Sequence, residues 1–320
     1  MSTSRLPADF LEADGARAIA SARSRVAFRV GNGVSTGHHG EILQGVFEDE
    51  RGGVHGGLVT LACGIYSSRV TFAPDVGSPL EVLPHWKVKS RRAAELVLRW
   101  GGGEALGGKL VIDSNTPVGW GLGSSTSDVI ATIRAVSQAI GQHVDSRRVA
   151  DLAVRAEVAS DATMFEDRTV LFAQRNGTIL EDFGVSIPAL DIHGFTTDAR
   201  GGLDTLSLSP AQYGWRELEC FRVLRGLFRR AMVTQDPRLV AHVATASARI
   251  NQAYLPKPHF EAIERLVEEV GAIGLQVAHS GPVVGLIFDP REACGAEQLE
   301  CIEARLEALG FSCTTRFSTR

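Results

Sequence analysis

The sequence predicts an α+β fold divided into two domains, and three observations support this prediction. The first part of the chain opens with β-rich runs and then turns to periodic helices. Beyond about residue 186 the pattern restarts as strand, helices, two strands, helix and strand, which is typical of an α+β sandwich. A length of 320 residues is enough for two domains that each bury a core. We therefore expect a loose N-terminal tail over residues 1–24, a first domain over 25–185 and a second over 186–320.

The composition is that of a soluble globular protein, with 44% hydrophobic and 22% charged residues. No apolar run approaches the roughly 18 residues of a membrane helix, and residues 1–22 lack the apolar core of a secretion signal. The five cysteines show no Cys-x-x-Cys pairing and are expected to be reduced thiols. A net charge of −4 does not favour nucleic acid. These features predict a cytoplasmic protein that binds neither nucleic acid nor membrane, and they leave a homodimer open.

Strands and one helix are expected in the first hundred residues. Residues 26–30 are typical of a strand, which leads into a glycine-dense segment over residues 31–45 that we interpret as a shaped loop. Two β-rich runs follow at residues 57–63 and 67–73, and the second alternates apolar with polar side chains. Residues 85–100 have helical periodicity and end at three glycines. This half of the chain therefore begins as a sheet with one covered face.

The next segment predicts a strand, two helices and a hairpin. Residues 109–113 form the strand, residues 124–141 show strong helical periodicity, and a second helix runs from Asp145 to Glu157. Residues 169–180 are expected to form a β-hairpin, because Asn176-Gly177 is a strong signal for a tight turn. The first domain is expected to end soon after this hairpin.

The second half supplies the remaining elements of the sandwich. A glycine turn is expected at Gly201-Gly202, and Pro256 and Pro258 separate two helical stretches. In chain order the expected elements are a strand over 189–196, helices over 215–254 and 259–270, two strands within 274–289, a helix over 297–309 and a strand over 312–317.

The stretch from Asn115 to Asp128 places a glycine-rich turn directly before a helix. A helix N-terminus presents unpaired N–H groups and the positive end of the helix dipole, so it is suited to bind an anion. Glycines let phosphate oxygens approach the backbone closely, and the serine and threonine hydroxyls can cap the helix or bind Mg2+. An ordinary serine-capped helix after a flexible turn is the alternative interpretation.

The pattern Pro-x-x-x-Gly-Leu-Gly-Ser-Ser-Thr in this stretch resembles the phosphate-binding motif of the GHMP kinases. Two further loops support the resemblance, one over residues 40–45 and one over residues 278–285, and both are similar to the L-threonine kinase branch of that family. The resemblance implies a ribosomal protein S5 domain 2-like N-terminal domain and a ferredoxin-like C-terminal domain, with the active site between them. It implies ATP and Mg2+ as cofactors. The nucleotide-binding residues that it implies are Pro117, Gly119, Gly121, Leu122, Gly123, Ser124, Ser125 and Thr126.

An acidic pair at the end of the second helix completes the expected catalytic group. Glu157 and Asp161 resemble the family's acidic pair, in which the glutamate helps to hold magnesium and the aspartate faces the substrate hydroxyl. We expect Ser125 and Glu157 to hold the metal, and Asp161 to act as base or orienting acceptor. The alternative is a structural role for each residue, as a helix-end carboxylate and an N-capping aspartate.

The expected substrate residues come from the first and third loops. Glu41 and Gln44 are suited to pair with the ammonium and the carboxylate of an amino acid, and one of two adjacent histidines, which we take to be His39, is expected to line the pocket. Ser280 and Gly281 are expected to bind substrate from the third loop. A metal site at the two histidines is disfavoured, because adjacent side chains point apart and no third ligand has a recognisable spacing.

Two departures from the family pattern lie in the first loop. Many members carry a lysine there, whereas the first lysine of this chain is Lys87. The threonine kinase branch usually has a Pro-Gly-x-Cys-Gly run before the glutamate, and residues 35–40 differ from it. The second change lies where the resemblance places the acceptor.

The resemblance as a whole implies an ATP-dependent kinase that phosphorylates the hydroxyl of L-threonine or a related hydroxy amino acid. One alternative is a GHMP kinase that acts on homoserine or on a hydroxylated intermediate of a specialised pathway. Another is an inactive relative that binds nucleotide or metabolite without turnover. The joint presence of Ser125, Glu157 and Asp161 favours an enzyme, because a relative without activity does not need all three.

Overall fold

The computed structural model describes residues 28–198, 211–292 and 295–319. The tail predicted over residues 1–24 and the turn predicted at Gly201-Gly202 lie outside these residues. Within them, no helix is both long enough and apolar enough to cross a membrane.

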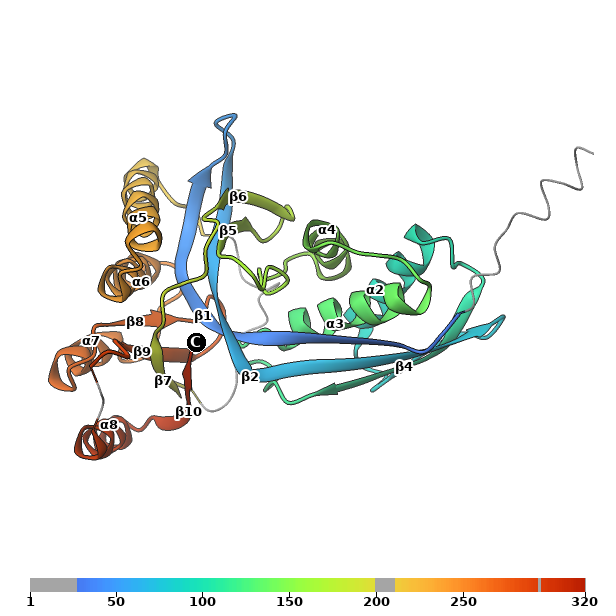
Figure 1. Cartoon of the computed structure of the whole chain (residues 1–320). Coiled ribbons are helices and arrows are strands. Elements are labelled where there is room, and N and C mark those ends of the chain that lie inside the picture. The colour runs from blue at the N-terminus through green and yellow to red at the C-terminus, as the bar shows by residue number, and fades with distance from the viewer. Residues whose placement is uncertain (1–27, 199–210, 293–294, 320) are drawn as a thin grey trace, which may run out of the picture.

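The strands form one mixed sheet in the order β10-β7-β9-β8-β1-β2-β4-β3, and the small β5–β6 hairpin attaches to β2 (Figure 1). Neighbouring strands are antiparallel except for β3 and β4. The strand bounds are β1 Gly31–Glu48, β2 Val54–Val76, β3 Leu80–Leu83, β4 Leu106–Ser114, β5 Val170–Ala173, β6 Thr178–Asp182, β7 Asp191–Thr196, β8 Gly274–Val277, β9 Val283–Phe288 and β10 Ser312–Ser318.

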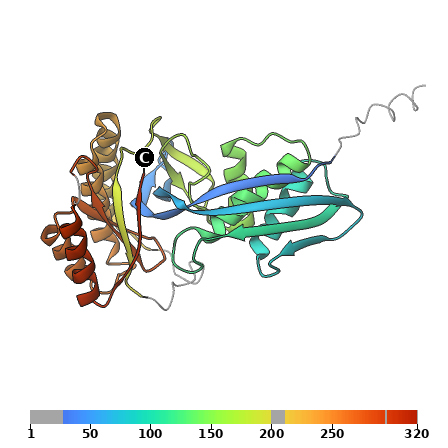
Figure 2. The same cartoon turned by 60° about the horizontal axis from the view of Figure 1, so that its bottom comes forward.

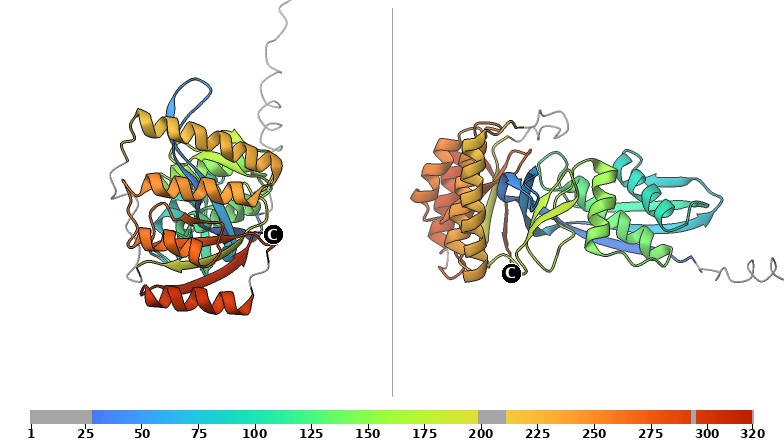
Figure 3. Two further views of the ribbon diagram at one scale, coloured as in Figure 1. Left: turned by 90° about the vertical axis from the view of Figure 1, so that its left-hand side faces the viewer. Right: turned by 90° about the horizontal axis from the view of Figure 1, so that it is seen from above.

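Two groups of helices cover the two halves of the sheet. Helices α2, α3 and α4 pack on one face of the N-terminal half, and α5 to α8 form an outer layer over the C-terminal half, so the molecule is elongated (Figures 2 and 3). The helix bounds are α2 Val88–Trp100, α3 Ser124–Ala139, α4 Ser146–Glu157, α5 Trp215–Thr234, α6 Pro237–Asn251, α7 Phe260–Glu269 and α8 Ala296–Ala308.

The glycine-dense segment over residues 31–45 is the strand β1, so the prediction of a loop there was wrong. The glycines serve helix packing instead. A Cβ atom at Gly31 would lie 2.0 Å from the carbonyl oxygen of Ala135, and one at Gly33 would lie 2.0 Å from that of Ala131. Helix α3 can therefore rest directly on the backbone of β1, which is a known reason for glycine within a strand.

Most other predicted elements are present with small shifts of their ends. The strand predicted over residues 26–30 is an exception, because residues 28–30 precede β1 without regular structure and residues 26–27 lie outside the described residues. The two runs at residues 57–63 and 67–73 belong to one long strand, β2. The hairpin predicted around Asn176-Gly177 is β5–β6, and Gly177 has the positive φ of 71° that such a turn needs. The predicted α+β architecture is thus confirmed. The boundary predicted at residues 185–186 falls between β6 and β7, and an independent domain on each side of it stays a prediction.

Candidate active site

A cavity of about 310 Å³ lies where the two halves of the molecule meet. Most of its walls come from β1, the N-terminus of α3 with its preceding loop, the end of α4 with the segment after it, the β5–β6 hairpin and the turn between β8 and β9. Leu58 of β2 and Lys89 of α2 also line it. The predicted phosphate loop, acidic pair and third loop therefore meet in one place, although they are far apart in the sequence.

The phosphate loop ends at Gly123, which is the N-cap of α3 and has a φ of 73°. No side chain caps this helix, so its first N–H groups remain available to a ligand. Gly119 and Gly121 also have positive φ, and all three glycines line the cavity together with the predicted Leu122, Ser124, Ser125 and Thr126. The predicted Pro117 is not among the lining residues, because the loop turns into the cavity after it. An uncapped helix start behind a glycine loop suits the phosphates of a nucleotide.

The backbone of the third loop packs closely on that of the phosphate loop, beside an apolar contact between Leu122 and Ala278. A Cβ atom at Gly121 would lie 2.7 Å from the nitrogen and the Cα of Gly281, and one at Gly281 would lie 2.0 Å from the carbonyl oxygen of Trp120. Gly281 thus supports the phosphate loop and is not a lining residue, whereas its neighbour Ser280 does line the cavity.

Glu157 at the end of α4 meets two hydroxyls of the α3 N-terminus. Ser125 Oγ donates to Glu157 Oε2 at 2.7 Å, and Thr126 Oγ1 donates to Glu157 Oε1 at 3.0 Å. Burial raises the pKa of Glu157 to about 7, while the hydroxyls and the nearby Lys89 oppose this shift. Paired carboxylate and hydroxyl oxygens beside a phosphate site are the hard ligands that Mg2+ prefers. The predicted metal pair, Ser125 and Glu157, therefore fits the ion.

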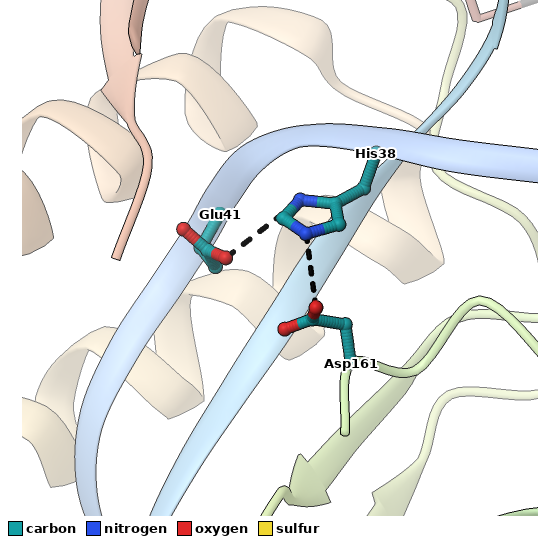
Figure 4. Close-up of side chains that lie close together, drawn as sticks. All are labelled: His38, Glu41 and Asp161. Atoms are coloured by element: carbon teal, nitrogen blue, oxygen red, sulfur yellow. Dashed lines mark hydrogen bonds and ion pairs between the residues drawn. The ribbon is translucent and has the colours of Figure 1, made fainter. Parts of the chain in front are cut away.

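Asp161 lies beside this pair and forms an ion pair with His38 of β1 (Figure 4). His38 Nε2 is 3.0 Å from Asp161 Oδ2, and Thr126 Oγ1 lies 3.2 Å from the same oxygen. The single hydroxyl hydrogen of Thr126 is shared between Asp161 and Glu157. Burial alone would lower the pKa of His38, but the charge and hydrogen bond of Asp161 outweigh it and raise the pKa from 6.5 to about 9. Burial alone would raise the pKa of Asp161, but the His38 charge and the hydrogen bonds with His38 and Thr126 together outweigh it and hold that pKa below its ordinary value. Asp161 is therefore an ionised acceptor at neutral pH.

Glu41 lies on the other side of the His38 ring, with its Oε1 3.8 Å from His38 Nδ1 (Figure 4). Its Oε2 accepts a hydrogen bond from the backbone N–H of His279 at 2.6 Å, and burial raises its pKa to about 8. His38, Glu41 and Asp161 each offer a ligand atom within 4.8 Å of the others, which is a spacing that a metal ion can bridge. The raised pKa of His38 favours the protonated ring, which has no lone pair for a metal.

A break in the register of β1 explains why His38 and Glu41 both reach the cavity. Residues three apart on a regular strand point to opposite faces. The pairing of β1 with β2 shifts between His38 and Glu41, and Gly40 between them has a φ of 71°. The irregularity turns both side chains to the same side.

Besides Gly281, two further predicted substrate residues, His39 and Gln44, do not line the cavity. His39 is completely buried behind β1, with its Nδ1 2.5 Å from Gln276 Nε2 and its ring against Phe317. Burial lowers the pKa of His39 to about 3, so the ring is neutral. Gln44 is also buried, and its backbone is bonded to Ser247 and Asn251 of α6. Adjacent side chains on a strand point to opposite faces, so His38 lines the cavity where His39 was expected.

Several cavity residues were missed in the sequence. Lys89 approaches Glu157 with its Nζ 3.9 Å from Oε2, and Gln174, Arg175 and His279 complete the wall. The absence of a lysine from the first loop could have pointed to His38. A buried aspartate needs a nearby cation, and without that lysine a histidine of the same loop is the candidate. We find no sequence signal for Gln174 or Arg175, since a hairpin turn usually carries polar residues at the surface.

The fold and this site define a phosphotransferase with a helix-terminal phosphate loop and an adjacent acidic pair. The GHMP kinase N-terminal domain model matches residues 88–166, and the GHMP kinase C-terminal model matches residues 228–297. The L-threonine kinase of Salmonella typhimurium is 30% identical over 273 residues, which cover 78% of this chain and 80% of that protein. The L-threonine kinase of Citrobacter freundii is 27% identical over 65% of this chain and 67% of that protein.

The chain belongs to the GHMP kinase family, and it is an ATP-dependent phosphotransferase that acts on a hydroxyl group. Solved structures share the fold. A mevalonate kinase from Staphylococcus aureus has a TM-score of 0.60 at 15% identity and covers 91% of this chain and 98% of its own. A homoserine kinase from Cytophaga hutchinsonii has a TM-score of 0.61 at 14% identity, with coverage of 93% and 96%. These comparisons confirm the predicted two-domain GHMP kinase fold.

Proposed function

We propose that this enzyme transfers the γ-phosphoryl group of ATP to the hydroxyl of L-threonine or a closely related hydroxy amino acid, with Mg2+ as cofactor. The observation that carries the proposal is the contact network of Thr126, which bonds the carboxylates of both Glu157 and Asp161 at the start of the phosphate loop helix. The Thr126 hydroxyl thus contacts both Glu157, which is expected to hold the metal, and Asp161, which is expected to face the acceptor. The names of the two L-threonine kinase relatives support the choice of acceptor.

The residues of this chain divide the work of phosphoryl transfer. The N–H groups at the start of α3 bind the phosphates, and Ser125 with Glu157 would hold Mg2+, which neutralises the charge of the phosphates when bound. Asp161 accepts the hydrogen bond of the acceptor hydroxyl and turns its oxygen toward the γ-phosphorus. The bond from that phosphorus to the bridging oxygen of ADP breaks as the new ester forms, and Asp161 or solvent takes the proton. His38 keeps Asp161 ionised for this role.

The acceptor lies beside Asp161, within reach of Glu41 and Ser280. We propose that Glu41 receives the ammonium group, since a cation there would offset the burial that raises its pKa. His39 and Gln44 support the walls from behind and do not contact the substrate in this proposal. Homoserine or another hydroxylated metabolite is the alternative acceptor. An inactive relative is not favoured, because the acidic pair is assembled in the cavity.

The test is ADP release from MgATP across L-threonine, L-serine, L-homoserine and alcohols that are not amino acids. Turnover with L-threonine, lost in Asp161→Asn, supports both the acceptor and the role of Asp161. A preference for homoserine or for a simple alcohol would overturn the acceptor. A cytoplasmic location, a homodimer and the lack of nucleic acid or membrane partners stay predictions.

A further inference from the structure

One wall of the cavity has polar atoms that the proposed reaction does not use. It is formed by Ser160, which precedes Asp161, and by Gln174 and Arg175 at the turn of the β5–β6 hairpin. The backbone N–H of Ser160 donates to the carbonyl oxygen of Gln174 at 3.0 Å, so the two segments are fixed to each other. We call this group of three residues the hairpin wall.

Two buried atoms of the hairpin wall have no hydrogen-bond partner within the part of the chain that the structure describes. They are Ser160 Oγ, on a residue that is only 2% exposed, and Gln174 Oε1. A buried polar atom without a partner destabilises a protein, so native structures rarely keep one without a reason. Because both residues line the cavity, a bound molecule is the natural partner.

Arg175 adds a positive charge to the same wall. Among the described residues no carboxylate lies within ion-pair distance of its guanidinium. Its charge lowers the pKa of His279 in the third loop, although burial is the larger cause of that shift. The cation next to the metal pair is instead Lys89. Arg175 is an exposed residue at the edge of the same cavity. Its charge is therefore available to an anion that enters with the acceptor.

We propose that the hairpin wall recognises the carboxylate and ammonium groups of the acceptor and so restricts the enzyme to amino acids. This inference rests on the proposed function. Arg175 and the Ser160 hydroxyl donate to the carboxylate. Gln174 Oε1 accepts one hydrogen of the ammonium group, and Glu41 accepts another. An acceptor with its hydroxyl at Asp161 has its carboxylate within reach of Ser160, since the two residues are adjacent in the chain. An alcohol without a carboxylate leaves the guanidinium and the serine hydroxyl without a partner.

The test compares L-threonine with L-threoninol, which keeps the hydroxyl and the ammonium group but lacks the carboxylate. Both are assayed with the wild-type enzyme and with Arg175→Ala, Arg175→Lys and Ser160→Ala. For Arg175→Ala we expect kcat/KM for L-threonine to fall about 10- to 100-fold, as for loss of a charge-assisted hydrogen bond. The value for L-threoninol and the KM for ATP should not change. Arg175→Lys should recover part of the loss, and Arg148→Ala, at an exposed ion pair on α4, is the matched control.

The possible outcomes separate this inference from the proposed function. Turnover of L-threonine that Arg175→Ala does not affect would overturn the inference alone. An equal loss for both acceptors, or a raised KM for ATP, would also overturn it, because Arg175 would then act on structure or on the nucleotide. A wild-type enzyme that prefers L-threoninol would overturn both. If no acceptor is turned over, the proposed function is wrong. The inference is then tested by calorimetry in the presence of a non-hydrolysable ATP analogue, and equal affinities for L-threonine and L-threoninol would overturn it.

Discussion

Replacement of His38 by glutamine tests whether the charge on this ring matters for catalysis. Glutamine can still donate a hydrogen bond to Asp161, but it cannot carry the positive charge. In the structure Asp161 keeps a second bond, from Thr126 Oγ1 at 3.2 Å, so its orientation should largely survive. The substitution therefore removes mainly the charge.

The size of the effect follows from the geometry of the pair. A hydrogen bond to a charged group contributes about 1.5–3 kcal/mol and a neutral one about 1 kcal/mol. The difference of about 0.5–2 kcal/mol corresponds to a decrease of about 2- to 30-fold in kcat. His38→Ala removes the whole interaction and should lower kcat about 100-fold. Loss of a fully buried pair can have a larger effect, but the Asp161 side chain is 23% exposed, so water replaces part of the bond.

The pH dependence provides a second readout of the same pair. The pKa of His38 in the folded protein, about 9, lies above its ordinary value of 6.5. The stabilisation from its charge is therefore complete below about pH 6.5 and is lost as the pH rises through about 9. The wild-type kcat and the free energy of unfolding should both decline over this interval, and His38→Gln should flatten both profiles. His55→Gln is the control, because His55 makes a similar pair with Asp49 at 2.8 Å outside the cavity. If His38→Gln kept the wild-type kcat and the wild-type decline of kcat at alkaline pH, the proposed role of the His38 charge would be refuted.

Three further substitutions test the rest of the site. Asp161→Asn should lower kcat at least about 100-fold with nucleotide affinity intact, and a smaller loss would contradict its role as acceptor. Glu157→Gln should raise the Mg2+ concentration for half-maximal ADP release about 10-fold or more, whereas an unchanged requirement would place the metal elsewhere. Gly121→Ala should lower the free energy of unfolding by about 1–3 kcal/mol and weaken ATP binding, because its positive φ and the backbone of Gly281 exclude a side chain. Denaturant titration would show this loss, and Gly226→Ala, with open space around it, should show none.

The part of the site that local sequence determines could be predicted. The glycines and hydroxyls of the phosphate loop lie next to each other in the chain and next to the helix that gives them their function. Glu157 and Asp161 could be placed because both follow one helix end. In each case a short segment fixes the geometry, so long-range packing adds little information.

The part that depends on strand register could not be predicted. His38 and His39 are adjacent, and only the shift in pairing between β1 and β2 decides which ring faces the cavity. The glycines of β1 suggested a loop. They are needed instead for the close approach of α3, and this helix lies about a hundred residues away in the chain, so the local sequence does not show the contact. Arg175 reaches the cavity only because its hairpin packs beside the segment that carries Asp161.

The course of β1 makes the two halves of the enzyme depend on each other for folding. Its first residues lie under α3, whereas Ile42, Leu43 and Phe47 near its end are buried in one apolar cluster with Phe221 and Phe228 of α5. A fragment that ends near residue 185 would lose the part of this cluster that the C-terminal helices supply, and a fragment that begins there would lack the three side chains. We therefore expect a single cooperative unfolding transition that joins both halves of the enzyme.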